Sequence, residues 1–245
     1  MGIADREGAP RRLCPVFFLL DTSGSMSGAP IGAVNSAMEN VLPELASMNY
    51  SNSDAEIGVG VVSFNFSADW IPERAIKDPE SFPWNALDAL GGTNMGAAFD
   101  QLNDALSKSH GLMKRATGSV APVLFLLSDG EPTDDWQPAL ERLKQNNWYK
   151  ASIKVAIGYG ESSNDAVLAE FTGTMENVIH TNDPNDLKRM IKFVAIRSSQ
   201  VASDGTQAGP GGTQGEEKKD TNSEIGKIIK DELPEILAED PNDDW

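Results

Sequence analysis

The chain has 245 residues, of which 40% are hydrophobic and 23% charged, so most of it can fold around a core as one α/β domain. Its formal net charge of −17 would repel phosphate, which argues against nucleic acid and anionic membranes and favours cations or basic partners. No apolar run approaches the roughly 20 residues that span a membrane, and residues 1–12 lack an apolar signal segment, so we expect a cytoplasmic protein without a membrane partner.

The first element follows a flexible N-terminus, residues 1–12. The run CPVFFLL, residues 14–20, is apolar throughout, which predicts a strand buried on both faces. The single cysteine, Cys14, cannot form an internal disulfide, which fits a reducing compartment. A helix with regularly spaced apolar residues is predicted to begin at Pro30, and Pro43 inside it predicts a kink or an early end.

The rest of the folded part alternates strands and helices. A short strand of mixed polarity is predicted to return antiparallel at the sheet edge, and Asp134 and Gln137 are spaced as a capping box for the helix that follows them. The alternation predicts a three-layer α/β fold, with a mostly parallel sheet, one short antiparallel edge strand and helices on both faces. The predicted strands are 56–64, 67–73 (the edge strand), 120–127, 152–158 and 177–180, and the helices are 94–108, from about 135, 164–172 and from 183.

The composition changes near residue 200. Residues 201–224 are rich in Gly, Ser, Thr and Gln and predict a disordered linker. Residues 225–245 predict an acidic tail with one short amphipathic segment, broken by Pro234. That segment is expected either to dock on its own domain or to bind a groove of a partner.

Oxygen-bearing side chains follow two of the buried strands. Asp21, Ser23 and Ser25 stand on alternate positions after the first strand, Thr93 follows two glycines, and Asp129 precedes Gly130. In open α/β sheets, ligands bind beyond the carboxyl ends of the strands. A donor set of oxygen alone favours a hard divalent cation such as Mg²⁺ over Zn²⁺, with Mn²⁺ or Ca²⁺ also compatible.

Three motifs, DTSGSM, GGT and LLSDG, in this order resemble the metal-ion-dependent adhesion site (MIDAS) of von Willebrand factor type A (vWA) domains. The resemblance implies a Rossmann-like vWA domain over residues 13–200 and a partner protein that offers an Asp or Glu to the metal. It also implies direct or nearly direct contact of three hydroxyls with the ion and contact through water for two carboxylates. The hydroxyls implied to contact the ion are those of Ser23, Ser25 and Thr93, and the carboxylates implied to contact it through water are those of Asp21 and Asp129.

A narrower resemblance rests on RRLCPVFFLLDTSGSM and LLSDGEPTDDW, which are similar to TerY-type bacterial vWA proteins. This group is associated with tellurium-resistance and stress-response gene clusters, often beside protein kinases and phosphatases. It implies a stress-response or phosphorylation-signalling role, with a kinase or phosphatase as a partner. The polar residues from 201 onward are not part of this pattern.

The favoured function is a metal-dependent protein-binding module and not an enzyme. One alternative is a haloacid-dehalogenase-like, Mg²⁺-dependent phosphatase with Asp21 as nucleophile, but that chemistry usually needs a second carboxylate where Ser23 stands. Another alternative is a scaffold that recruits partners through its acidic tail. His110 and His180 lie in no recognisable hydrolase motif.

Overall fold

The computed structural model describes residues 11–52, 55–113, 118–161, 163–204 and 220–238. Its strands are β1 (Arg12–Asp21), β2 (Ala55–Phe64), β3 (Ala68–Ile71), β4 (Val123–Ser128), β5 (Ile153–Tyr159) and β6 (Val178–Thr181). Its α-helices are α1 (Ala29–Ser51), α2 (Met95–Ala105), α3 (Trp136–Gln145), α4 (Asn147–Ala151), α5 (Asp165–Thr172), α6 (Pro184–Asp204) and α7 (Thr221–Ala238). Short 3₁₀ helices are η1 (Gly24–Met26), η2 (Pro79–Ser81) and η3 (Met175–Asn177).

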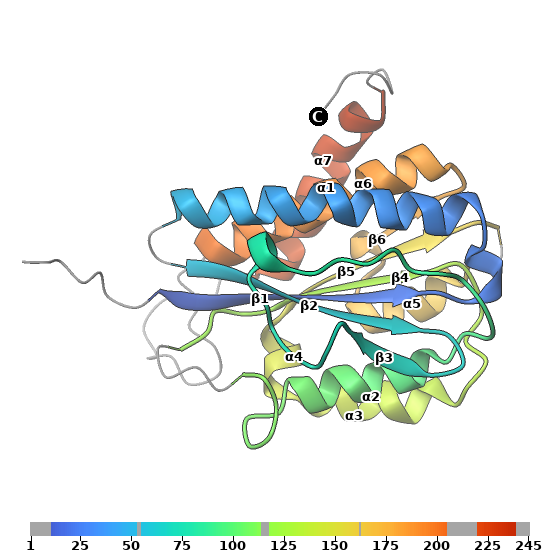
Figure 1. The fold of residues 1–245 in the computed structure, drawn as a ribbon, viewed down its shortest axis with the longest axis horizontal. Coiled ribbons are helices and arrows are strands. Elements are labelled where there is room, and N and C mark those ends of the chain that lie inside the picture. Colours follow the sequence, from blue (N-terminus) through green and yellow to red (C-terminus); the bar gives the residue numbers. More distant parts are fainter. Residues whose placement is uncertain (1–10, 53–54, 114–117, 162, 205–219, 239–245) are drawn as a thin grey trace, which may run out of the picture.

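The strands form one sheet in the order β3-β2-β1-β4-β5-β6. All neighbouring pairs are parallel except β2 and β3, so the predicted parallel sheet with one antiparallel edge strand is confirmed. Helices α1 and α6 cover one face of the sheet, and α2 and α3 cover the other (Figure 1). The strand order reverses at β1, which has β2 on one side and β4 on the other. The carboxyl ends of β1 and β4 therefore flank the point where ligands of such sheets bind.

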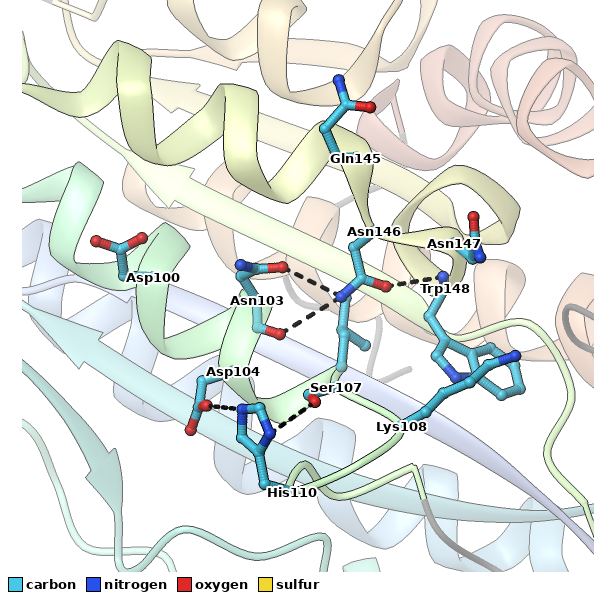
Figure 2. A pocket seen from close by; sticks show the side chains of 11 residues that line it. Asp100, Asn103, Asp104, Ser107, Lys108, His110, Gln145, Asn146, Asn147 and Trp148 are labelled. Atoms are coloured by element: carbon cyan, nitrogen blue, oxygen red, sulfur yellow. Dashed lines mark hydrogen bonds and ion pairs between the residues drawn. The ribbon is translucent and has the colours of Figure 1, made fainter.

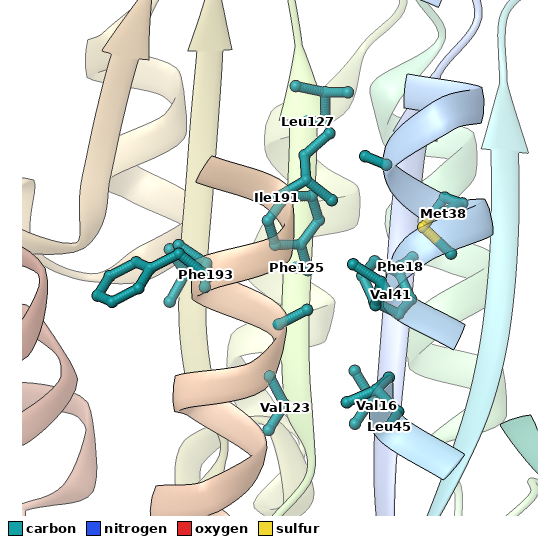
Figure 3. Close-up of a cluster of buried hydrophobic side chains, with 14 of the residues drawn as sticks. Val16, Phe18, Met38, Val41, Leu45, Val123, Phe125, Leu127, Ile191 and Phe193 are labelled. Atoms are coloured by element: carbon teal, nitrogen blue, oxygen red, sulfur yellow. The ribbon is translucent and has the colours of Figure 1, made fainter. Parts of the chain in front are cut away.

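Alternate side chains of β1 enter different hydrophobic clusters. Phe18 and Leu20 pack toward α1 and α6, and the Phe18 ring lies 5.5 Å from that of Phe125 on β4 (Figure 3). Phe17 and Leu19 pack into the cluster that includes α2 and α3. Because helices cover both faces of β1, the strand needs no polar side, which explains its continuous apolar sequence.

Two helices continue through an internal proline, so α1 does not end early at Pro43 and α7 is not broken at Pro234. Helix α1 extends to Ser51 past Pro43, and α7 extends to Ala238 past Pro234. An internal proline costs a helix about 3 kcal/mol. In α1, the neighbouring Val41, Leu42 and Leu45 are all buried, and burying such side chains stabilises by about 1.5–3 kcal/mol each. Packing against the sheet and α6 thus outweighs the local cost.

Helices α6 and α7 also correct the ends of the predicted linker. Helix α6 extends past residue 201 to Asp204, and α7 begins at Thr221. The remainder of that linker, residues 205–219, and the acidic residues 239–245 lie outside the described residues, as does most of the expected flexible N-terminus. Helix α7 packs beside α6, because its apolar side chains complete the core; those buried are Ile225, Ile229 and Leu233.

Helix α7 is also held by one asparagine at its start. The side-chain oxygen of Asn222 accepts hydrogen bonds from the backbone N–H of Lys154 (2.9 Å) and from the side-chain amide of Asn177 (2.9 Å). Its amide group donates to the carbonyl of Thr172 at 3.3 Å. The first turn of α7 is thereby fixed to the start of β5 and to the ends of α5 and η3.

We expect Asn222→Ala to lower the free energy of unfolding by about 2 kcal/mol, because the N–H of Lys154 is left without its partner in a buried place. Urea denaturation of the full chain measures the change. The neighbouring substitution Ser223→Ala serves as the control, with an expected change within about 0.5 kcal/mol. Equal stability of the two variants would show that α7 is not anchored by Asn222.

No helix in the described part of the chain combines the length and the apolar character that crossing a membrane requires.

Candidate metal centre

Asp21 is the last residue of β1, and its side chain is completely buried. One carboxylate oxygen accepts a hydrogen bond from the backbone N–H of Ser23 at 2.8 Å, and the other accepts from the hydroxyl of Ser128 at 2.6 Å. Among the described residues, no basic side chain pairs with Asp21. Its negative charge is therefore held in place by two hydrogen bonds and is not neutralised by a neighbouring cation.

Ser23, Ser25 and Asp129 form a compact cluster of oxygen atoms. The Ser23 and Ser25 hydroxyls donate to the same oxygen of Asp129, Oδ1, at 3.3 and 2.9 Å, and lie 3.1 Å from each other. Ser23 and Asp129 are buried, whereas Ser25 is exposed. The cluster therefore reaches from the interior to the surface at the carboxyl ends of β1 and β4.

Thr93 joins this arrangement through the backbone of its loop. The N–H of Gly24 donates to the carbonyl of Gly91 at 3.0 Å, which ties the Thr93 loop to the turn after β1. Thr93 and Thr133 also exchange two hydrogen bonds, both 2.9 Å long, which tie it to the loop after β4. Thr93 is largely buried, and its hydroxyl has no hydrogen-bond partner among the described residues, so its lone pairs are available to a ligand.

Ser128 and Thr133 also support the site, although the sequence alone indicates no role for either residue in it. Ser128, which is buried, orients the Asp21 carboxylate, and the Thr133 hydroxyl accepts from the backbone of Thr93 while donating to Asn94. The sequence feature that could have indicated Ser128 is its position as the polar residue that ends an apolar strand. Thr133 had no such signal, because its role depends on contact with a loop 40 residues away.

The predicted capping role of Asp134 is wrong. The residue before α3 is Asp135, whose side chain makes no capping hydrogen bond, whereas Asp134 accepts from the N–H groups of Gly96 and Ala97 at 3.1 and 3.0 Å. Asp134 therefore caps α2. This is favourable because α2 and α3 begin side by side, and the free N–H groups of α2 attract a carboxylate. The contact also fixes the helix that follows Thr93.

Burial affects both carboxylates of the site. Removal from water raises the pKa of Asp21 to about 6, although hydrogen bonds from Ser128 and Ser23 partly oppose this. Burial likewise raises the pKa of Asp129, against the hydrogen bonds from Ser25 and Ser23. A cation placed between these loops would compensate the two buried negative charges.

The donor set fits a hard cation. Among the described residues, no group of three or more His, Cys, Asp or Glu side chains is arranged to hold a metal. The cluster instead combines two carboxylates with the hydroxyls of Ser23, Ser25 and Thr93, and ions such as Mg²⁺ prefer oxygen ligands of this kind. The structure thus brings the five predicted residues to one edge of the sheet, and their role as metal ligands stays a prediction.

The raised pKa of Asp21 predicts a pH-dependent stability of the metal-free protein. Since the folded-state pKa of about 6 exceeds the ordinary value of 3.8, Asp21 stabilises the fold below pH 4, and this contribution is lost as the pH rises through 6. The loss amounts to about 3 kcal/mol. Urea denaturation between pH 4 and 7 in EDTA measures it, with Asp21→Asn as the control that should have a flatter pH profile. Identical profiles would contradict the prediction.

A second polar cluster lines a surface pocket at the other end of α2 (Figure 2). His110 contacts the hydroxyl of Ser107 at 3.1 Å and the carboxylate of Asp104 at 2.8 Å, an order of groups also found in hydrolases. However, the His110 side chain is 66% exposed, and Ser109 competes for the same ring nitrogen at 2.8 Å. These contacts link the end of α2 to the turn that follows it, and we assign them a structural role.

The fold and the loop cluster together define an α/β domain with an oxygen-lined site at the reversal of strand order. The family model described as von Willebrand factor type A domain matches residues 16–193, and the chain belongs to this family. The human inter-alpha-trypsin inhibitor heavy chain H4 is 31% identical over 120 residues, which is 48% of this chain and 12% of that protein.

Solved structures share the fold at low sequence identity. The von Willebrand factor type A protein from Catenulispora acidiphila is 19% identical, with a TM-score of 0.58 over 77% of this chain and 43% of that chain. Proximal thread matrix protein 1 from the mussel byssus is 18% identical, with a TM-score of 0.58 over 76% of this chain and 48% of that one. The chain thus spans less than half the length of these relatives.

Proposed function

We propose that this chain is a protein-interaction module in which a bound divalent cation accepts a carboxylate from a partner protein. The observation that carries the proposal is the convergence of the Ser23 and Ser25 hydroxyls on Asp129, beside the buried Asp21. The mussel relative is described with a zinc-occupied MIDAS motif, which supports a divalent cation at the corresponding place here. The oxygen-only donor set favours Mg²⁺, with Mn²⁺ or Ca²⁺ as alternatives.

The roles of the individual side chains in the site are proposed from the resemblance to the MIDAS motif. Ser23, Ser25 and Thr93 would hold the ion directly or nearly so, while Asp21 and Asp129 would hold it through water. Neutral hydroxyl ligands would leave the ion with much of its positive charge, available to a carboxylate at an open position. Asp21 also fixes the turn itself, since it binds the N–H of Ser23 and the hydroxyl of Ser128.

The two alternatives have less support. A phosphatase would need Asp21 to attack a substrate, yet its carboxylate is completely buried and both of its oxygens accept hydrogen bonds. The apolar side of α7 is not accessible to a partner, because Ile225, Ile229 and Leu233 are buried in the chain's own core, while the acidic residues 239–245 lie outside the described residues.

The pathway and the identity of the partner are proposals that rest on the resemblance of residues 11–26 and 126–136 to TerY-type proteins. They comprise a bacterial stress-response or tellurium-resistance role and a kinase or phosphatase of the same system as the partner. A cytoplasmic location is also proposed, because the single cysteine fits a reducing compartment and no apolar run approaches the length that spans a membrane. The acidic surface is consistent with a basic partner, and the formal charge of −17 argues against nucleic acid.

The proposed function is tested by capture on the immobilised full chain. Extract of the source cells is applied in Mg²⁺ or in EDTA, with Asp129→Asn as the matched variant that keeps the acceptor oxygen. We expect a defined set of proteins that wild type retains in Mg²⁺ and that is absent in EDTA and from the variant. The same proteins in all three samples would refute a metal-dependent interaction.

A further inference from the structure

Large hydrophobic side chains are exposed beside the candidate metal centre. Among the described residues, four such side chains are strongly exposed, and two of them, Phe66 and Leu90, lie in loops at the same edge of the sheet as Thr93. Phe66 is 69% exposed and Leu90 is 55% exposed. Exposed apolar side chains that gather in one place indicate an interaction surface more often than isolated ones do.

Phe66 occupies a turn between β2 and β3 that is fixed to the site. Its carbonyl accepts a hydrogen bond from the side-chain amide of Asn94 at 2.6 Å, and the carbonyl of Asn65 accepts from the backbone of Asn94 at 2.8 Å. The Asn65 amide also donates to the hydroxyl of Thr22 at 3.3 Å. The turn is therefore tied both to the residue after Thr93 and to the residue after Asp21.

The Phe66 ring lies against two glycines. A Cβ atom at Gly91 would be 2.5 and 2.6 Å from two ring carbons of Phe66, and one at Gly92 would be 3.4 Å from two others. Gly91 also has a φ of +84°, which side chains disfavour. The glycine pair thus provides the space in which the inner side of the ring packs, while most of the ring remains open to solvent.

Leu90 is positioned by the turn after β1. Its N–H donates to the carbonyl of Thr22 at 2.8 Å, and the carbonyl of the next residue, Gly91, accepts from Gly24. The Leu90 backbone therefore runs beside the loop that carries Ser23 and Ser25. The Phe66 turn and Leu90 thus both bind residues that are adjacent in sequence to predicted metal residues, namely Asn94 and Thr22. A partner that binds the ion would therefore also lie close to Phe66 and Leu90.

The charges around these loops restrict the partner further. The segments 65–69, 88–94 and 129–135 contain no Lys, Arg or His, and they contain several acidic residues, including the exposed Asp69, Asp88, Glu131 and Asp135. An acidic partner surface would be repelled there except at the ion itself. A single carboxylate among apolar and basic side chains matches this arrangement.

We propose that Phe66 and Leu90 bind a large apolar side chain next to the carboxylate that the metal accepts. The partner then presents an Asp or Glu with a Leu, Ile, Phe or Trp beside it in space, on a surface that is otherwise basic or uncharged. The proposal rests on the proposed function, because it assigns the specificity of the same site.

The test uses the full chain and a phage-displayed library of random dodecapeptides as the probe. Selection is carried out with Mg²⁺, and bound phage are eluted with EDTA. We expect the selected peptides to carry an Asp or Glu within two positions of a large apolar residue. The dissociation constant of one such peptide is then measured for the wild type and for Phe66→Ser, Leu90→Ser and Gly91→Ala.

We expect Phe66→Ser to weaken peptide binding at least about tenfold, since the apolar contact is lost. Gly91→Ala should weaken it similarly, because the new methyl group displaces the unchanged Phe66 ring. Tyr50→Ser removes an even more exposed ring, 77% exposed, on α1, and should leave peptide binding unchanged. Mg²⁺ affinity without peptide, measured by calorimetry, should be the same for wild type, Phe66→Ser, Leu90→Ser and Tyr50→Ser.

Three outcomes would overturn the proposal. If the selected peptides bind wild type and Phe66→Ser equally in Mg²⁺, the apolar residues do not set specificity, although the metal-dependent function stands. If Phe66→Ser weakens Mg²⁺ binding itself, the ring serves the Thr93 loop and not the partner. If no peptide depends on Mg²⁺, the proposed function fails together with this inference.

Discussion

Asparagine in place of Asp129 is expected to weaken Mg²⁺ binding roughly 100-fold or more, which corresponds to about 2.7 kcal/mol of binding free energy. The reason is electrostatic, because the substitution removes one of two buried charges while keeping an oxygen where the Ser23 and Ser25 hydroxyls donate. Calorimetric titration of metal-free wild type and variant with Mg²⁺ and Mn²⁺ measures the change.

The fold should survive this substitution. Burial raises the pKa of Asp129, so the ionised carboxylate is held at a cost, and its removal should leave the melting temperature of the metal-free protein unchanged or higher. Asp165→Asn is a suitable control, since Asp165 begins α5 and contacts His180 outside the loop cluster. Equal Mg²⁺ affinities of wild type and Asp129→Asn would place the ion elsewhere.

Phe125→Ala should produce the largest loss of stability, about 3–5 kcal/mol in the free energy of unfolding. Phe125 is 1% exposed at the centre of the sheet, where its ring packs against Phe18 and against the cluster under α1 and α6. Removing the ring leaves a cavity that the surrounding strands cannot close. Against a total stability of about 5–15 kcal/mol, this is enough to unfold a substantial fraction of the protein.

Urea denaturation measures this loss of stability, and two further variants serve as comparisons. Phe125→Leu fills most of the space and should cost less than about 1.5 kcal/mol. Tyr50→Ala removes an exposed ring and should cost less than about 0.5 kcal/mol. A small effect of Phe125→Ala would mean that the face of the sheet under α1 and α6 is less tightly packed than the structure has it.

The parts of the fold that could be predicted are those determined by local pattern. The continuous apolar sequences of β1 and β4 have no polar face, and such strands require helices on both sides of a parallel sheet. Two of the three loop motifs, those after β1 and β4, could be placed at one edge because the carboxyl ends of parallel strands meet there, whereas the Thr93 loop was placed by the resemblance alone. That reasoning needs no knowledge of which side chains touch.

The parts that could not be predicted depend on contacts between distant residues. Asp134 is spaced as a cap for α3, but it binds the N-terminus of α2, and only the side-by-side start of the two helices reveals this. Pro43 disfavours a helix locally, whereas burial of Val41, Leu42 and Leu45 maintains it. Likewise, Asn222 gives no sign in the sequence of its bonds to β5 and η3.

The Ser25–Asp129 hydrogen bond joins residues 104 positions apart, so the proposed coordination shell exists only in the native state. A cation that binds there would act as a linked ligand of folding and would add RT ln(1 + [ion]/Kd) to the stability of the domain. At an ion concentration 100 times the Kd, this is about 2.7 kcal/mol. Depletion of the ion would then lower the amount of folded protein in the cell as well as its capacity to bind a partner.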